Sequence, residues 1–574
     1  MTDIRRTVLW VVFTMSLVLL WDGWQKEHGQ LSMFSPPAAK PVAAVSAPGA
    51  AGVATPGVAP TILPGAMTGM VPAGAVAAQA SEQVLIKTDV MNVTLESLGG
   101  DVSRVELLQY LTSPETGLFD PLLQALHIQD KKPNQATPVL LLDAAGRSYK
   151  AQSGLLGSKG EALPNHGTLM TFMPGERTLK AGVNELIVKL ESPEISGVKL
   201  VKIFTFKRGD YVIGVKHEIV NVGTTALTPQ VYVQLVRDGI AGPGGSDFYS
   251  TFTGPAVYTD KSKFRKVEFT DIDKGKIDIE KTANDGWVAM VQHYFASAWL
   301  NNEAGPREFF AKKVDSKMYS VGMVYTLAPL APGATAARSD QLFVGPQEEN
   351  KLAALAPGLD LVKDYGMFKM LSQPLFWLLD QLHSLLGNWG WAIIALVVLL
   401  KIAFYWLNAS AYRSMAKMKA VGPKVQAMRE RLKDKPQEMQ QEMMRIYREE
   451  KVNPIGGCLP IFLQMPFFMG LYWVLLSTVE MRGAPWLGWI VDLADKDPYF
   501  ILPLLMTASS LFQVWLNPTP PDPMQAKMMW FMPLAFSFMF FVFPSGLVLY
   551  WLTNNILSIA QQWMINKQLG VQNS

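Results

Sequence analysis

The stretch WGWAIIALVVLLKIAFYWL, residues 389–407, decides the architecture, because it is long enough and apolar enough to cross a bilayer. Further apolar runs follow it at 458–478, 499–516, 528–543 and 547–563. Several of these runs are close to or below the ~20 residues that a span normally needs, which favours a bilayer thinned around them. With 49% hydrophobic residues and a mean hydropathy of +0.15, the 574-residue chain is too apolar for an ordinary soluble protein.

The N-terminus contains a candidate anchor. Arg5 and Arg6 precede an apolar run at 8–20, which is followed by Trp24. A cleaved signal peptide has the same outline, but tryptophan is typical of a membrane interface. We therefore interpret residues 1–28 as a transmembrane anchor, which brings the number of predicted transmembrane helices to about six.

A tether and an all-β domain come next. Residues 29–80 are rich in Ala, Pro, Gly and Val and have almost no charge, which predicts a disordered linker. Residues 81–345 change to a period of two, as where Met91, Val93 and Leu95 alternate with polar residues. Turn signals punctuate this segment without a long helical stripe, so we predict an antiparallel β-sandwich.

Residues 361–388 are predicted to form an amphipathic helix. Phe368, Leu371, Leu375 and Leu378 recur at steps of three and four, with polar residues elsewhere on the helix. Such a helix can lie in the outer membrane interface just before the span at 389–408, or it can pack on the β-domain.

The orientation follows from the lysine and arginine bias of the short loops. Residues 409–455 carry eleven Lys and Arg, whereas residues 480–498 carry two. The first loop is therefore predicted to be cytoplasmic and the second to lie outside. Counting spans from there, including those within 456–568, places both termini in the cytoplasm and the β-domain outside the membrane.

The basic segment 409–455 is predicted to be a helical hairpin. Gly422-Pro423 is expected to break the helix that continues the preceding span, and a second helix is expected at 437–451. Methionines accompany the basic residues, and they suit either promiscuous apolar ligands or packing between the hairpin's own helices. The Lys and Arg would suit a ribosome or anionic headgroups.

Polar side chains occur at membrane depth. Lys401 lies inside its apolar run, where it either reaches the headgroups by snorkelling or faces a hydrated cavity. Gln464, Thr553, Asn554 and Gln561 fall in later spans, and each must find a hydrogen-bond partner or water. Bonds between helices and a wet groove are both compatible with this pattern.

Several functional classes find no support. The single cysteine, Cys458, and the scattered histidines predict no metal site, and we find no phosphate-binding glycine loop or catalytic motif. A net charge of +3 gives no reason to expect direct nucleic-acid recognition. No cofactor and no enzymatic activity are predicted.

The membrane region closely resembles the YidC membrane insertase family. The motifs that carry the resemblance are GNWGWAIIALVVLLK (387–401), SMAKMKAVGPKVQAMRERL (414–432), QEMMRIYREEKVNPIGGCLPIFLQMPFF (441–468), DPMQAKMMWFMP (522–533) and FPSGLVLYWLTNN (543–555). TFTGPAVY (251–258) and GWVAMVQHYFASAW (286–299) resemble the family's Gram-negative periplasmic β-supersandwich domain. The resemblance implies a multi-domain inner-membrane protein.

The resemblance also implies a mechanism and partners. A hydrophilic groove would hold the polar flank of a nascent membrane protein, with Lys401 as its positive site and Gln464, Thr553, Asn554 and Gln561 beside it. A substrate helix would leave into the lipid bilayer along an apolar path formed by Met465, Phe468, Phe540, Tyr550 and Trp551. The family implies cooperation with the SecYEG translocon and SecDF, and a ribosome at the hairpin.

One position departs from the family. Most members place arginine where this chain has Lys401, so the charge is kept but the planar guanidinium fork is lost. Two rival classes are a secondary transporter and an anchored periplasmic binding protein. The first would need interrupted half-spans and intramembrane carboxylates, and the second would not need further spans with polar interiors.

Overall fold

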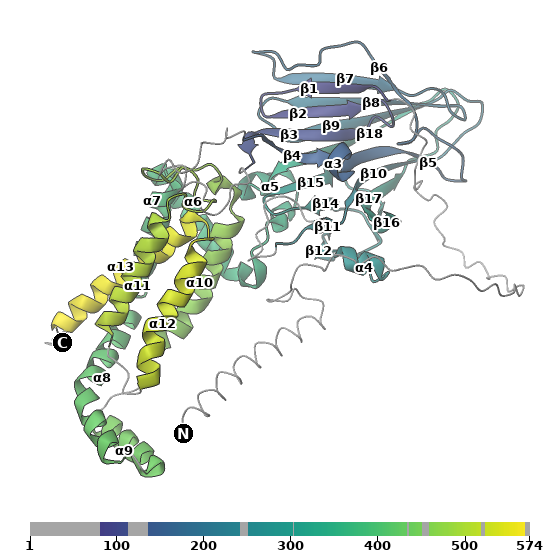
Figure 1. The fold of residues 1–574 in the computed structure, drawn as a ribbon. Helices are drawn as coiled ribbons and strands as arrows, with labels where there is room; N and C mark the ends of the chain where they lie inside the picture. The colour runs from purple at the N-terminus through teal and green to yellow at the C-terminus, as the bar shows by residue number, and fades with distance from the viewer. Residues whose placement is uncertain are drawn as a thin grey trace, which may run out of the picture. The chain divides into compact units, whose positions relative to one another are not determined.

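The computed structural model describes residues 81–112, 136–240, 251–301, 303–432, 435–450, 459–517 and 523–568. The predicted anchor at 1–28 and tether at 29–80 lie outside these described residues. The described part comprises an all-antiparallel β-domain that ends with the strand finishing at Pro346, and a helical region from Lys369 onwards (Figure 1).

The first sheet of the β-domain has nine strands in the order β1-β2-β3-β5-β10-β17-β16-β13, with β4 paired to β3. Its strands are β1 (Gln83–Lys87), β2 (Met91–Glu96), β3 (Val102–Leu111), β4 (Pro138–Asp143), β5 (Lys150–Gly157), β10 (Pro229–Asp238), β13 (Thr282–Ala283), β16 (Arg307–Asp315) and β17 (Met318–Thr326). The short helix α3 (Ala144–Arg147) connects β4 to β5.

The second sheet also has nine strands, in the order β12-β11-β14-β15-β18-β9-β8-β7-β6. Its strands are β6 (Thr171–Phe172), β7 (Glu185–Glu191), β8 (Val198–Lys207), β9 (Val212–Asn221), β11 (Gly254–Thr259), β12 (Lys263–Lys266), β14 (Trp287–Val291), β15 (Phe295–Leu300) and β18 (Thr335–Pro346). The short helix α4 (Phe269–Asp273) follows β12.

The two sheets pack face to face around one hydrophobic core, so the predicted sandwich is confirmed. Period-two alternation is its physical basis, because successive side chains of a strand point to opposite faces. Met91, Val93 and Leu95 are all buried, as the sequence predicts. The hairpin between β8 and β9 turns at Gly209, whose φ of +70° glycine adopts without steric cost.

Short helices link the β-domain to the helical region. They are α5 (Glu349–Leu355), η1 (Leu359–Val362) and η2 (Gly366–Phe368). The helices that follow are α6 (Lys369–Leu386), α7 (Trp389–Ala403), α8 (Tyr405–Arg431), α9 (Pro436–Glu449), α10 (Leu459–Ser477), η3 (Val479–Met481), α11 (Ile501–Leu516), α12 (Pro523–Phe540) and α13 (Ser545–Gln568). Helix α13 packs against α7, α8, α10 and α11, and α12 packs against α11.

The helix predicted at 361–388 is present as α6, but it begins only at Lys369, because the chain before it forms the short helices η1 and η2. Its buried residues Leu375, Phe376 and Leu379 share one hydrophobic cluster with α7, α10 and α13. Its opposite side exposes Met370 and Trp377. A helix with one apolar face in the bundle and further apolar side chains outside it suits a membrane interface.

No single described helix is both long enough and apolar enough to cross a bilayer, but α7 and residues Tyr405–Ser414 of α8 meet that test together across a bend of 65°. The helices Ile501–Leu516 and Ala526–Phe540 are apolar but shorter. The bend lies at Phe404, so the range 389–408 is not one straight helix. The number of about six spans stays a prediction.

The predicted break at Gly422-Pro423 is wrong, because α8 continues through both residues to Arg431. Proline removes a backbone donor but does not end a helix that tertiary packing holds. Here Val421, Val425 and Met428 form a small hydrophobic cluster with residues of α9. The hairpin of α8 and α9 therefore has a core of its own.

We expect the hairpin to be dispensable for folding of the bundle. Replacing residues 424–451 by a short glycine–serine linker should change the thermal midpoint of the bundle by less than about 3 °C, which corresponds to about 1 kcal/mol for a unit of about 150–250 residues. Tryptophan fluorescence during heating in detergent measures it. A matched control, Leu475→Asp in the buried core of the bundle, should remove the protein from the membrane fraction. Loss of the hairpin-deleted protein from that fraction would refute independent folding.

Candidate functional site

The helical bundle exposes many large apolar side chains and buries several polar ones beside its hydrophobic core, unlike a typical water-soluble protein. Large apolar side chains on its surface are exposed, among them Trp406 at 78%, Phe538 at 68% and Ile402 at 66%. Exposed apolar area of this extent marks contact with lipid or a partner. The buried polar side chains of α13 are Ser545, Asn555, Ser558, Gln561, Gln562 and Asn566.

Lys401 is held against this polar face of α13. Its Nζ donates a hydrogen bond of 2.7 Å to Ser558 Oγ, which in turn donates one of 2.8 Å to the carbonyl oxygen of Asn554. The described residues place no carboxylate within 4.0 Å of Nζ. The ammonium group is therefore half-buried and hydrogen-bonded, but it has no counter-ion among the described residues.

A second hydrogen bond crosses to α13 on the other side of the bend. Gln561 Nε2 donates to the carbonyl oxygen of Tyr405 over 3.2 Å. Ser558 and Gln561 are three residues apart and so lie on neighbouring turns of one helix face. The bend at Phe404 is consequently flanked by two contacts to α13, one through Lys401 and one through Tyr405.

The structure brings together some of the predicted groove residues. Lys401, Asn554 and Gln561 belong to the contacts around the bend, Asn554 through its backbone carbonyl. Thr553 is half-buried on α13, and Gln464 is half-buried on α10. Both helices contact α8, so these residues belong to the same bundle, although no hydrogen bond joins either of them to Lys401.

Sequence reasoning missed Ser558. It lies four residues after Asn554 and three before Gln561, so helical spacing alone places it on their face. Asn408 was also missed; its side chain is buried, and its Nδ2 has no hydrogen-bond partner among the described residues.

The residues predicted as an exit path form an aromatic cluster between α10, α12 and α13. Phe468 stacks on Trp551 with ring centroids 5.6 Å apart, and Phe540 lies 5.1 Å from the same ring. Tyr550 contacts Phe468 at 5.7 Å. Phe540, Tyr550 and Trp551 are buried, whereas Met465 is half-exposed.

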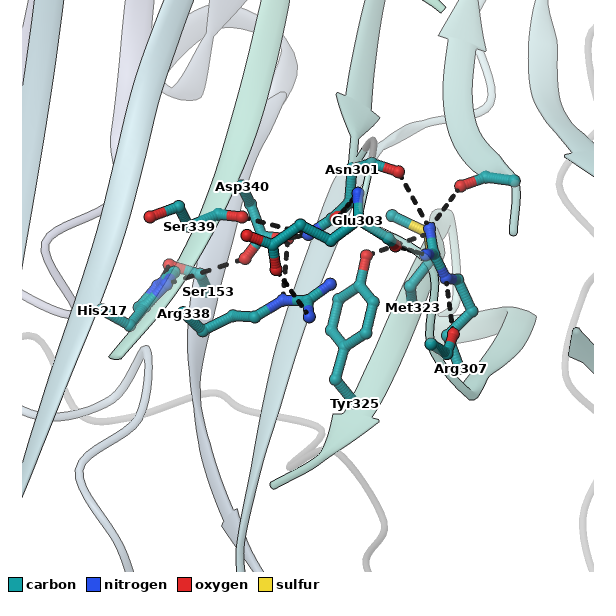
Figure 2. Close-up of polar contacts among 12 residues, drawn as sticks. Ser153, His217, Asn301, Glu303, Arg307, Met323, Tyr325, Arg338, Ser339 and Asp340 are labelled. Carbon is teal, nitrogen blue, oxygen red and sulfur yellow. Dashed lines mark hydrogen bonds and ion pairs between the residues drawn. The ribbon is translucent and has the colours of Figure 1, made fainter. Parts of the chain in front are cut away.

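A second polar cluster lies between the sheets of the β-domain. Figure 2 shows three of its residues, Ser153, His217 and Asp340, close together. His217 Nε2 is 2.8 Å from Ser153 Oγ, and its Nδ1 is 3.9 Å from Asp340 Oδ2. Serine, histidine and aspartate in this order form the series that activates a nucleophile in hydrolases. An active site of that kind requires an accessible serine and a short bond from histidine to aspartate.

The geometry does not suit catalysis. Ser153 is almost fully buried and His217 is completely buried. The distance of 3.9 Å from Nδ1 to Asp340 is too long for the hydrogen bond that would orient the imidazole. Burial, reinforced by Lys202, lowers the pKa of His217 well below its usual range. We interpret the cluster as a polar bridge between the sheets.

The bridge continues toward Arg338. Asn301 donates a hydrogen bond of 2.7 Å to Asp340 Oδ1, and Arg338 pairs with Glu303 at 3.2 Å (Figure 2). The Arg338 guanidinium also lies 4.1 Å from the centroid of the Tyr325 ring. Despite these partners, burial raises the pKa of Asp340 to about 6.

These findings define first a class, a membrane-embedded helical bundle that carries an all-β domain. The family model described as "YidC periplasmic domain" matches residues 83–378, and that of the "60Kd inner membrane protein" matches residues 381–572. The membrane protein insertase YidC of Cupriavidus necator is 52% identical over 571 residues, covering 99% of this chain and 98% of that protein. The chain belongs to the YidC family of membrane protein insertases.

Another relative and one solved structure are also similar to this chain. The membrane protein insertase YidC of Cupriavidus taiwanensis is 51% identical over 576 residues, covering 99% of this chain and 98% of the relative. A crystal structure of an active YidC insertase with its first transmembrane domain resolved covers 84% of this chain and 92% of its own, with 17% identity and a TM-score of 0.37.

The raised pKa of Asp340 predicts a pH-dependent stability. An acid with a raised folded-state pKa stabilises the fold below its unfolded pKa of 3.8, and this contribution is lost as the pH rises through about 6. Lowering the pH from 8 to 5 should therefore raise the free energy of unfolding of the parent by about 1 kcal/mol relative to that of Asp340→Asn, whose side chain is always neutral. Calorimetry of the β-domain transition in the full chain measures the difference.

Asp278→Asn is the matched control, because the Asp278 side chain is almost fully exposed. The difference in melting temperature between Asp278→Asn and the parent should be the same at both pH values. Parallel pH profiles for Asp340→Asn and the parent would show that Asp340 does not take up a proton in this range.

Proposed function

We propose that this chain inserts membrane proteins by holding the polar flank of an incoming segment beside Lys401 while the apolar segment enters the lipid. The observation that carries the proposal is a hydrogen-bonded ammonium, on the polar face of α13, that has no carboxylate partner among the described residues. Such a group can attract an acidic flank. Gln464, Thr553, Asn554 and Gln561 would supply further hydrogen-bonding groups to it.

The apolar segment would leave along the aromatic cluster. Met465 is half-exposed and offers first contact, and Phe468 is only partly buried behind it. Phe540, Tyr550 and Trp551 are covered, so passage between α10 and α12 would require those helices to part. Transfer of apolar area from water to lipid contributes ~25 cal/mol per Å², which suffices as a driving force without a nucleotide.

The proposed topology places both termini and the α8–α9 hairpin in the cytoplasm, and the β-domain in the periplasm. The hairpin's basic residues would then face a ribosome, and the SecYEG translocon and SecDF would be further partners. Of the methionines considered for substrate binding, Met428, Met439 and Met443 pack within the hairpin, and Met444 is half-exposed. This favours a role for the hairpin through charge.

Reconstitution tests the proposal directly. Purified protein in liposomes without nucleotide should insert a small single-span substrate, so that protease leaves a protected fragment. Empty liposomes treated in the same way should give little of it. Equal protection with and without the protein would overturn the proposal.

The charge of Lys401 should matter in proportion to the acidity of the substrate's tail. A unit charge pair ~4 Å apart is worth ~1 kcal/mol in water and ~4 kcal/mol at an effective dielectric of 20. Lys401→Ala should therefore slow insertion of a substrate with one acidic tail residue by about tenfold, which corresponds to about 1.4 kcal/mol. The measurement is the insertion rate with zero, one or two acidic residues in the tail.

Lys401→Arg should be nearly silent in this series, and Lys401→Glu should be the most harmful variant. Lys567→Ala, at the exposed end of α13, serves as the matched control and should leave all three tails unaffected. If Lys401→Ala slowed insertion equally for all three tails, the electrostatic role would be wrong, and Lys401 would be a lysine that only snorkels to the headgroups.

A further inference from the structure

Two segments, far apart in sequence, pass from the core of the β-domain to the core of the helical bundle. In the first, Leu359 and Val362 belong to the β-domain core, and Tyr365 belongs to the bundle core. In the second, Val479 belongs to the β-domain core, and Met481 belongs to the bundle core. Each segment therefore crosses between the cores within a few residues.

A charged residue lies at each crossing point, and the two form an ion pair. Lys363 Nζ is 3.6 Å from Glu480 Oε2 and 3.7 Å from Glu349 Oε2. The same Nζ lies 3.6 Å from the ring centroid of Phe376 on α6. Four segments thus converge on one ammonium: α5, η1, α6 and η3.

The burial of this group makes it costly to leave unpaired. The Lys363 side chain is completely buried, and burial lowers its pKa despite the two carboxylates. Burial raises the pKa of Glu480 for the same reason. A buried charge that loses its partner is strongly destabilising, so the segments that supply the partners are held together.

Peripheral contacts follow the same route. Arg482 donates a hydrogen bond of 2.8 Å to the carbonyl oxygen of Leu111 at the end of β3. Asn350 on α5 donates one of 3.1 Å to Asp380 on α6. These partners are more exposed than Lys363, and surface contacts of this kind contribute little individually.

We propose that Lys363 is a positioning residue for insertion, a buried clasp that fixes α6 and the end of α10 to the β-domain. The inference rests on the proposed function. Helix α6 is bonded to α10 through Ser372 Oγ and the Gly470 carbonyl oxygen, 3.0 Å apart. Helix α10 also carries Gln464 of the proposed groove and Phe468 of the aromatic cluster. The clasp therefore determines the positions of both residues.

Distance measurements test the clasp independently of insertion. Spin labels at Lys207 on β8 and Val491 in the loop before α11, in a Cys458→Ser background, should give a narrow distance distribution in the full chain. Lys363→Met should broaden it, and Glu480→Gln should broaden it less, because the Glu349 pair remains. Lys266→Met, which breaks the partly exposed pair of Lys266 with Asp364, is the matched control and should leave it narrow.

Insertion measurements then separate positioning from stability. At a temperature where all variants are folded, Lys363→Met should insert a neutral-tailed substrate about tenfold more slowly. A short bifunctional maleimide that links cysteines introduced at Asn350 and Asp380 should restore the insertion rate of Lys363→Met, because it replaces the clasp covalently. The same cross-link in a protein that retains Lys363 should leave the insertion rate unchanged.

An unchanged distance distribution in both Lys363→Met and Glu480→Gln would overturn the clasp. A broadened distribution with an unchanged insertion rate, or a low rate that the cross-link does not restore, would overturn the positioning role. If Lys363→Met does not accumulate, Glu480→Gln decides by the same criteria. Failure of insertion in the unaltered protein would overturn the proposed function while leaving the distance result to be judged separately.

Discussion

A polar group in apolar surroundings must find its hydrogen-bond partner inside the protein, and the bundle is arranged around this constraint. The helices α7, α11 and α12 expose large apolar side chains, and several polar side chains of α13 are buried on the inside. Lys401 and the Tyr405 carbonyl both find partners on α13, at Ser558 and Gln561. These two bonds hold the segments on either side of the bend at Phe404 to the same helix, α13.

The β-domain obeys the same constraint with different groups. A buried ammonium there is bonded to the backbone, as Lys202 Nζ donates to the carbonyl oxygens of Gly99 and Ser153 over 2.6 and 2.8 Å. Asp101 is the nearby carboxylate, and burial raises its pKa. The Lys202 charge is therefore held by groups of the fold itself. In the bundle, the Lys401 ammonium donates to the Ser558 hydroxyl, and the described residues place no carboxylate within 4.0 Å of it.

Periodicity predicted most of the fold, because it reports burial directly. The strands, α6 and the ends of α10 and α11 lie close to where the pattern places them. The break at Phe404 was missed because residues on both sides are equally apolar, so no periodicity changes there. The break predicted at Gly422-Pro423 was wrong because packing of Val421 and Val425 on α9 outweighs local propensity. Ser558 was missed because a single serine in an apolar helix gives a weak signal.

The ion pair of Lys363 with Glu480 shows why such sites escape sequence reasoning altogether. Each residue, taken alone, looks like an ordinary surface charge beside a helix end. Their significance arises only when two segments more than a hundred residues apart meet between two cores. A separate β-domain core would by itself suggest that the domain moves freely relative to the bundle. A fully buried ammonium shared by α5, α6 and η3 argues against free movement, because each displaced segment would leave a charge without its partner in a dry interior.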